Sequence, residues 1–230
     1  RTKNIQRWLW PGNCLLCTAR VPAGKDICAA CDRSLPRPAW ACPRCAAHGA
    51  AVESEGAACG ECQKHPPAYD FTRAAFRYAT PVDRLIQNLK YHGRLELSRV
   101  FGGYLVQHLM ILDDPLPDVI VPVPLHASRL RERGYNQSLE IARFVAKRLR
   151  VPIERGQARR IRPTAPQAEL TRDERKKNVH GAFTSSTAFA GQRVAIVDDV
   201  MTSGHTVNAL AESLLQSGAR DVRVWVVARA

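Results

Sequence analysis

Along most of the chain, short apolar runs alternate with segments in which hydrophobic residues recur every three or four positions. This recurrence predicts helices, because residues at that spacing share one helical face. In residues 81–91, for example, Leu85 and Leu89 fall on the same face as Val82. The same pattern predicts further helices over residues 95–112, 137–149 and 205–216.

The runs between these helices have the character of strands. Residues 119–123 form a continuous, β-branched apolar run, as expected of a strand that is buried on both faces. Further strands are predicted at residues 72–78, 157–161, 194–197 and 222–227. Because strands and helices alternate, we expect an α/β fold with a mostly parallel sheet flanked by helices.

All eight cysteines lie in the first 62 residues, as four C-x-x-C pairs. The pairs are Cys14/Cys17, Cys28/Cys31, Cys42/Cys45 and Cys59/Cys62. Two such turns bring together the four thiolates of a tetrahedral Zn²⁺ site, so the spacing predicts two structural Cys₄ sites, paired either sequentially or in an interleaved way. Four disulfides of a secreted protein are the alternative. They fit poorly with a cysteine-free remainder and with the expected lack of a signal peptide.

The composition changes at the tripeptide His65-Pro66-Pro67, which is typical of a hinge. We therefore expect a double zinc-ribbon module at residues 1–66 and the α/β domain at residues 67–230. Closed Cys₄ shells leave no position for a reacting water, so any ligand chemistry is expected in the second module.

The chain has a formal net charge of +13, which favours anionic partners such as phosphates, nucleic acid or an acidic membrane surface. A basic surface that is merely solvated is the plainer interpretation. No apolar run approaches the roughly 18–20 residues that a spanning helix needs, and we expect a cytoplasmic protein.

The candidate chemistry is concentrated in the stretch VAIVDDVMTSGHT, where an apolar strand precedes two acids, a short loop and a helix. The residues that follow the strand are Asp198, Asp199, Met201, Thr202, Ser203, Gly204, His205 and Thr206. Ligands of parallel sheets bind at the carboxyl ends of the strands, and N–H groups before a helix bind phosphate. Carboxylates repel phosphate but accept hydrogen bonds from vicinal hydroxyls. The stretch therefore predicts a sugar-phosphate site; a plain strand–loop–helix with an N-cap is the alternative.

Two basic segments are expected near this site. The run VPVP at 121–124 ends a strand and stiffens the next loop, where Arg129 and Arg133 can bind phosphate oxygens or simply face solvent. Residues 155–180 are polar and strongly basic, as in a lid that closes over a ligand or a surface that follows a nucleic-acid backbone. The candidate residues there are Arg160, Arg162, Arg172, Arg175, Lys176 and Lys177.

The acid pair and its loop resemble the signature of type I phosphoribosyltransferases, with Ser203 in place of a threonine and His205 in place of a small residue. We expect His205 to be exposed and not catalytic. The segments LIQNLKYHG, VPVPLHASRLRERGYNQS and RPTAPQAELTRDERKKNVHGAF occur in that order behind the cysteine pairs. Together they resemble the ComF family of competence proteins over nearly the whole chain.

The resemblance implies a type I phosphoribosyltransferase-like fold and binding of phosphoribosyl pyrophosphate (PRPP) with Mg²⁺. It also implies that the loop carrying Arg129 and Arg133 binds pyrophosphate. The implied biological role is DNA uptake during natural transformation, with single-stranded DNA and competence proteins such as a helicase as partners, in the cytoplasm or held by partners at the inner face of the membrane.

Three functions are compatible with these features. The first is a phosphoribosyltransferase in which Asp198 and Asp199 act on the ribose of PRPP while an acceptor displaces pyrophosphate. The second is a single-stranded DNA-binding module whose phosphoribosyl site is regulatory. The third is a structural adaptor with a decayed site, against which the intact acid pair argues.

Overall fold

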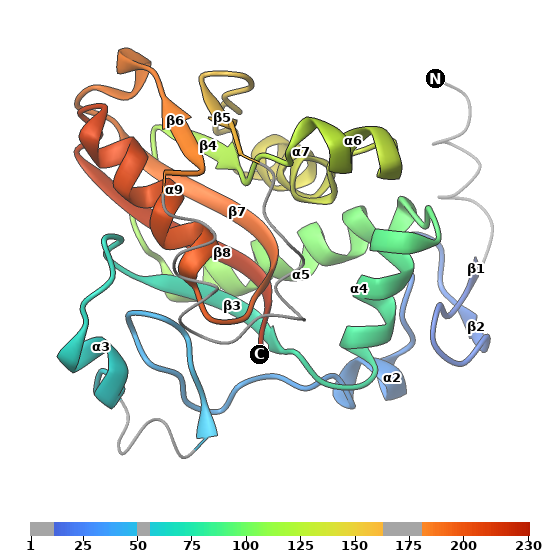
Figure 1. Cartoon of the computed structure of the whole chain (residues 1–230). Helices are drawn as coiled ribbons and strands as arrows, with labels where there is room; N and C mark the ends of the chain where they lie inside the picture. Colours follow the sequence, from blue (N-terminus) through green and yellow to red (C-terminus); the bar gives the residue numbers. More distant parts are fainter. Residues whose placement is uncertain (1–11, 50–55, 163–180) are drawn as a thin grey trace.

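The computed structural model describes residues 12–49, 56–162 and 181–230 of the chain. Its centre is a sheet of four parallel strands in the order β3-β8-β7-β4 (Figure 1). The strands are β3 (Thr72–Arg77), β4 (Val119–Pro122), β7 (Arg193–Met201) and β8 (Asp221–Arg229). The predicted α/β architecture with a parallel sheet is therefore confirmed.

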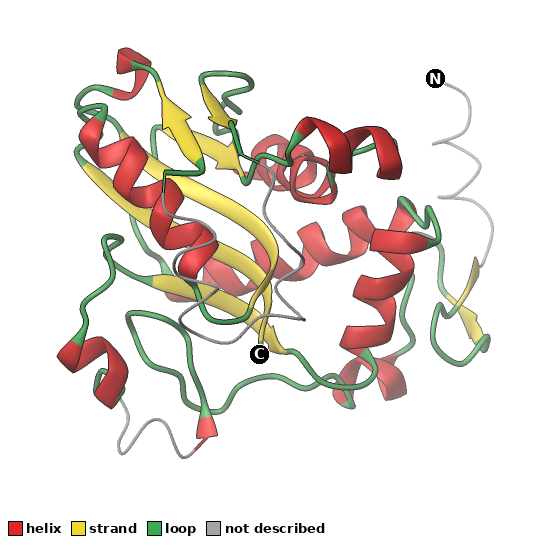
Figure 2. Ribbon diagram, viewed as in Figure 1, coloured by secondary structure: helices red, strands yellow, loops and turns green. Residues whose placement is uncertain are grey.

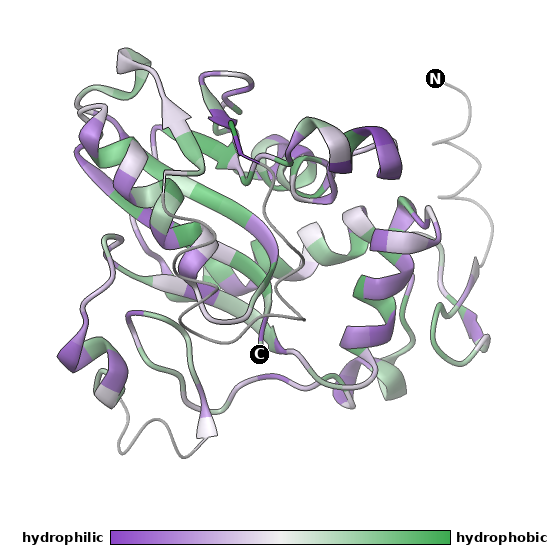
Figure 3. Ribbon diagram, viewed as in Figure 1, coloured by the Kyte–Doolittle hydropathy of each residue, from purple (hydrophilic) through white to green (hydrophobic). Residues whose placement is uncertain are grey.

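Helices cover both faces of this sheet, as Figure 2 shows. One face carries α4 (Val82–Tyr91), α5 (Glu96–Leu112) and α7 (Gln137–Leu149), and the other carries α9 (His205–Gln216). Alternate residues of β7 enter the two cores: Ala195 joins the α5 side and Ile196 joins the α9 side. The central strands are apolar on both faces for this reason, and they form the green centre of Figure 3.

Strand β7 is longer than its hydrophobic run predicts. We expected it to end at residue 197, but it continues through both acids to Met201. The neighbouring strand explains the difference, because β8 extends equally far and pairs Asp198 with Val226 and Met201 with Arg229. The acid pair is thus held by the sheet ladder rather than by a loop.

Two short elements also differ from expectation. The predicted strand at 157–161 forms as β5 (Ala158–Arg160), but it pairs antiparallel with β6 (Phe183–Ser185) in a sheet of its own. The loop expected after β4 contains a helix, α6 (Ala127–Arg133), which begins after His126 and ends at Gly134. A 3₁₀ turn, Thr187–Phe189, links β6 to β7.

The cysteine-rich segments pack against the sheet domain at two separate places (Figure 1). The first contains β1 (Gly12–Asn13), β2 (Arg20–Val21) and α2 (Ala29–Arg33), and it packs on α5. The second contains α3 (Gly60–Lys64) and lies against the ends of β3 and β8. Among the helices in the described ranges, none has both the length and the apolar character of a membrane span.

Candidate functional site

The eight cysteines form two groups of four, and each group places its sulfur atoms within 4.8 Å of one another. Cys14, Cys17, Cys28 and Cys31 form the first group, and Cys42, Cys45, Cys59 and Cys62 form the second. The pairing is therefore sequential. None of the eight is in a disulfide, so the disulfide alternative is wrong.

The geometry of both groups fits zinc. A Zn–S bond of about 2.3 Å gives a tetrahedral S–S edge of about 3.8 Å. Neighbouring sulfur atoms lie 3.7 Å apart between Cys17 and Cys28 and 3.6 Å apart between Cys45 and Cys59. Backbone N–H groups of Cys28 and Cys59 also donate to cysteine sulfurs across each group, at 3.3 and 3.2 Å, which stabilises thiolates. The chain thus has two Cys₄ zinc-binding sites.

The acid pair lies buried near the carboxyl end of β7, where Asp198 is 8% exposed and Asp199 is 2% exposed. Burying two adjacent carboxylates is costly unless hydrogen bonds or cations compensate for the lost water. Each acid has such a partner, and the partners come from different helices. Ser138 Oγ donates to Asp198 Oδ1 at 2.7 Å, and Lys90 Nζ lies 2.9 Å from Asp199 Oδ2.

Ser138 is held in place by the N-terminal cap of α7. Asn136 Oδ1 accepts from the backbone N–H groups of Ser138 and Leu139, at 3.0 and 3.3 Å. Asn136 Nδ2 in turn donates to the carbonyl of Val123, just beyond β4. The cap therefore ties the start of α7 to the end of a neighbouring strand, and it aims the fully buried Ser138 at Asp198.

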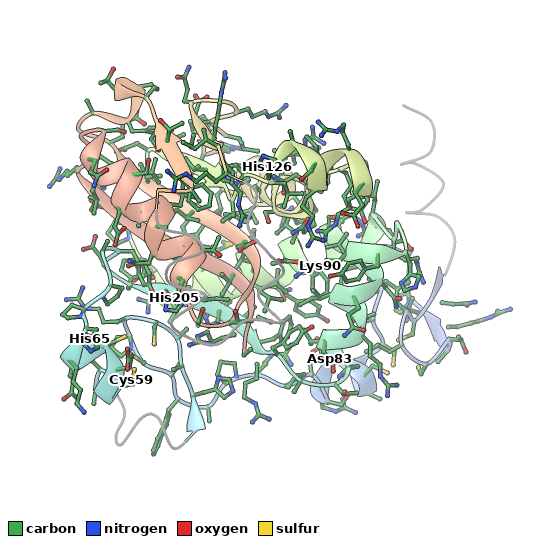
Figure 4. All side chains as sticks on the ribbon, in the orientation of Figure 1. Cys59, His65, Asp83, Lys90, His126 and His205 are labelled. Carbon is green, nitrogen blue, oxygen red and sulfur yellow. The ribbon has the colours of Figure 1, made fainter. Side chains whose placement is uncertain are left out.

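The second partner, Lys90, comes from the last turn of α4 and lies in the space between that helix and the strand ends (Figure 4). Burial disfavours its charge, but the carboxylates of Asp199 and Asp198 outweigh burial and raise the pKa of Lys90. For Asp198, burial and the charge of Asp199 raise the pKa to about 7, against the lowering effects of Ser138 and Lys90. Near neutral pH the site therefore contains an ion pair beside a carboxyl group close to its titration midpoint.

The loop after the acids combines a glycine of positive φ with the start of a helix. We call residues 201–206 the phosphate loop. Its first residue, Met201, is buried, and Gly204 has φ +81°, which a side chain rarely tolerates. Helix α9 begins at the next residue, so its first N–H groups face the loop. His205 is half-buried and lies 3.1 Å from Ser203 Oγ, so the expectation that it is exposed is wrong.

Three of the predicted basic residues have contacts that link them to the surroundings of the acid pair. Arg133 donates to Gln137 and stacks over the Tyr91 ring, 5.3 Å from its centroid, beside Lys90. Arg129 of α6 is half-buried, and its Nη1 lies 3.7 Å from Glu132 Oε2. Arg160 of β5 is half-buried: burial lowers its pKa, Asp198 opposes that effect, and Arg129 adds to it.

Arg160 is therefore electrostatically linked to both Asp198 and Arg129. Arg162 is exposed. Arg172, Arg175, Lys176 and Lys177 lie outside the described residues.

Two residues of the site escaped the sequence prediction. Ser138 lies in the quoted segment ending YNQS, but nothing local indicates that its hydroxyl meets an acid 60 positions away. Lys90 lies in the quoted segment LIQNLKYHG, and its pairing with Asp199 depends on how α4 packs against the sheet. No local sequence pattern indicates either contact.

The arrangement offers three kinds of chemistry side by side. Carboxylate oxygens can accept hydrogen bonds from hydroxyls, backbone N–H groups and hydroxyls of the phosphate loop can bind a phosphate, and arginines can neutralise further phosphate oxygens.

Comparison with known proteins gives matches over both parts of the chain. The double zinc ribbon domain matches residues 5–64, and the phosphoribosyl transferase domain matches residues 136–230. DNA utilization protein YhgH of Salmonella typhi is 34% identical over 226 residues, which cover 95% of this chain and 97% of that protein. YhgH of Escherichia coli K12 is 33% identical over 224 residues, with the same coverage. Competence protein F of Haemophilus influenzae is 30% identical over 227 residues, covering 94% and 96%.

Proposed function

The chain belongs to the family of DNA utilization protein YhgH and competence protein F, and we propose that its phosphoribosyl transferase domain binds PRPP. The observation that carries the proposal is the buried pair Asp198–Asp199 at the carboxyl end of β7, directly before the phosphate loop. A solvated strand–loop–helix connection has no need of two acids that are desolvated and individually partnered.

In the proposed complex, Asp198 and Asp199 accept hydrogen bonds from the 2′ and 3′ hydroxyls of the ribose. The phosphate loop binds the 5′-phosphate through its backbone N–H groups and the hydroxyls of Thr202, Ser203 and Thr206. Lys90 neutralises the charge of Asp199, and this reduces the repulsion between the acid pair and an anionic ligand. The acids and the loop thus recognise different parts of the same sugar phosphate.

The pyrophosphate end is assigned to the basic residues on the other side of the acids. Arg129 and Arg133 provide charge from α6, and Arg160 provides it from β5. Mg²⁺ would enter with the ligand and would neutralise part of its pyrophosphate charge. If an acceptor reacts, the bond from C1′ to pyrophosphate breaks as the bond to the acceptor forms. These residues would then hold the departing pyrophosphate and the ribose in line.

A specific surface favours a second function, binding of single-stranded DNA. The end of α7 and the following segment form a hollow of about 550 Å³ whose lining includes Lys147, Arg150 and Arg155, together with Pro152 and Ile153. The three charged residues are exposed. Arginines and lysines over a shallow apolar floor suit contact with a phosphate backbone. The family name that refers to DNA utilization supports this second proposal.

The primary proposal is tested by calorimetric titration of Mg²⁺–PRPP. Wild type should bind, and Asp198→Asn/Asp199→Asn should lose binding by about a hundredfold or more, because hydrogen bonds to charged acceptors contribute about 1.5–3 kcal/mol each. Asp118→Asn is the matched control, since Asp118 pairs with Arg193 at the opposite end of the same strand. It should bind as wild type does. Equal affinity of wild type and the double variant would overturn the assignment of the acids.

A further inference from the structure

Arg229, the last residue of β8, contacts both the phosphate loop and the second zinc site. Its Nε donates to the carbonyl of Cys45 at 2.9 Å, and Cys45 is one of the four cysteines of that site. Its Nη1 donates to the carbonyl of Met201 at 3.2 Å and also to that of Thr202. One guanidinium therefore bridges a zinc knuckle and the first peptides of the phosphate loop.

We infer that Arg229 is a positioning residue that fixes the phosphate loop against the second zinc ribbon, so that 5′-phosphate binding depends on this ribbon and not on the first. The inference rests on the proposed function, because it assigns a support to the same phosphate site.

The direction of the hydrogen bonds explains how the support works. In a trans peptide the C=O group of one residue and the N–H group of the next point in opposite directions. Arg229 and the backbone N–H of Ala230 hold the carbonyl of Met201, and Arg229 also holds that of Thr202. The N–H groups of Thr202 and Ser203 are thereby turned away from the ribbon. This orientation is the one in which backbone donors can converge on a phosphate on the far side of the loop.

Apolar packing connects the same two parts. The four cysteines of the second site share one buried cluster with Tyr69 and Met201. The Met201 side chain fills the space under Gly204, so that a Cβ there would lie 2.7 Å from Met201 Cε and 3.5 Å from Tyr69 Oη. Gly204 thus packs on Met201 and Tyr69, and these two side chains belong to the same buried cluster as the zinc-site cysteines.

The knuckle of the second site is itself fixed to the sheet. The backbone N–H of Thr72 donates to the carbonyl of Pro43 at 3.3 Å, and Arg44 Nη1 donates to the carbonyl of Asp70 at 3.1 Å. Pro43 and Arg44 lie between the ligands Cys42 and Cys45. Loss of the metal would release these anchors together with the carbonyl that Arg229 holds.

The first zinc site provides the contrast. Its cysteines pack with Val100 of α5, and the ribbon is anchored by Arg99 to Asp26 and by Tyr104 to Asp32. These anchors all lead to α5, whereas the anchors of the second ribbon include the carbonyls of Met201 and Thr202 through Arg229. Arg99 and Arg229 therefore each tie one ribbon to the sheet domain through a guanidinium, and Arg229 in addition holds the phosphate loop.

The test compares Arg229→Gln with Arg99→Gln, using ribose 5-phosphate and Mg²⁺–pyrophosphate as separate calorimetric probes. We expect Arg229→Gln to keep two zinc ions per chain by elemental analysis and to bind pyrophosphate as wild type does. Its affinity for ribose 5-phosphate should fall about tenfold or more, because two charge-assisted hydrogen bonds to the loop are lost. Arg99→Gln should bind both probes within about twofold of wild type.

An Arg229→Gln variant that is folded, zinc-loaded and unchanged toward ribose 5-phosphate would overturn the inference. A loss of equal size for both probes would also overturn it, because that pattern indicates general disruption. If the glutamine variant does not fold, Arg229→Lys replaces it. Lys keeps the charge but cannot reach both the ribbon and the loop, so the same selective loss is expected and wild-type binding would contradict the inference. If wild type itself binds no ribose 5-phosphate, the proposed function fails, and this inference fails with it.

Discussion

At the scale of single residues, the protonation of Asp198 is the property with the clearest consequences. Burial and Asp199 raise its pKa to about 7, while a carboxylate of an unfolded chain titrates near about 3.9. The folded state therefore holds this proton more tightly. This group's contribution to the free energy of unfolding is fully present below about pH 4 and is lost as pH rises through about 7.

Ligand binding should depend on pH in the opposite sense. Ribose hydroxyls donate to the ionised form of Asp198, so affinity for ribose 5-phosphate should increase from pH 6 to pH 8. Ser138→Ala removes a donor that stabilises the carboxylate and should move the midpoint upward by about one pH unit. Titrations of wild type, Ser138→Ala and Asp198→Asn across this range check the prediction. The asparagine variant gives the pH dependence that comes from the phosphate group itself. Coincident binding profiles of wild type and Ser138→Ala would contradict the predicted shift of the midpoint.

The Lys90–Asp199 ion pair is expected to contribute to the free energy of unfolding. Lys90→Met should lower the free energy of unfolding by about 3 kcal/mol, because it leaves a buried carboxylate without its cation. Adding Asp199→Asn should restore much of that loss, since no unpaired charge then remains. Denaturant unfolding of the single and double variants, with Lys147→Met as an exposed control, measures the coupling. A double variant whose loss is the sum of the two single losses would refute it.

At the scale of elements, the turn between β7 and α9 is the most constrained segment of the site. Gly204→Ala should weaken ribose 5-phosphate binding and lower stability by about 1–2 kcal/mol, because the new Cβ meets Met201 and φ is +81°. Gly103→Ala in α5 is the control, because its Cβ would make only an ordinary contact of 3.9 Å with Phe144. It should be neutral or stabilising by up to about 1 kcal/mol. Thermal unfolding and calorimetry of both variants distinguish the outcomes.

Elements with strong local periodicity were predictable from the sequence. The helix at 82–91 has its buried face at Val82, Leu85, Ile86 and Leu89, and the helix at 205–216 begins directly after Gly204. The fourfold C-x-x-C pattern also predicted both zinc sites, since its geometry is local.

Features that depend on distant partners were not predictable in the same way. The extension of β7 past residue 197 depends on pairing with β8, and β5 leaves the main sheet because its partner is β6. Arg229, Lys90 and Ser138 acquire their roles from contacts across the sheet, which no local pattern encodes.

At the scale of the whole molecule, the positive charge is the dominant property. With a net charge of +13, nonspecific attraction to polyanions is expected. A specific DNA surface must therefore contribute more affinity than the same number of charges elsewhere on the protein. Lys147→Glu/Arg150→Glu should weaken binding of a fluorescent oligothymidylate. The slope of log affinity against log salt concentration should become shallower by about one to two, which corresponds to the loss of about one to two phosphate contacts. Arg84→Glu/Arg220→Glu makes the same change of net charge at exposed sites away from that hollow.

Fluorescence anisotropy over a range of salt concentrations separates the two effects. A larger loss for the Lys147/Arg150 pair supports a DNA surface at the end of α7. Equal losses for both pairs would show that only net charge matters, and the second proposed function would then be withdrawn.

The most direct test of the central claim is a crystal structure of the full chain with Mg²⁺ and PRPP. We predict ribose hydroxyls within hydrogen-bond distance of Asp198 and Asp199, the 5′-phosphate on the phosphate loop, and pyrophosphate near Arg129 and Arg133. A ligand found elsewhere, or bound with its ribose away from the acids, would contradict the account.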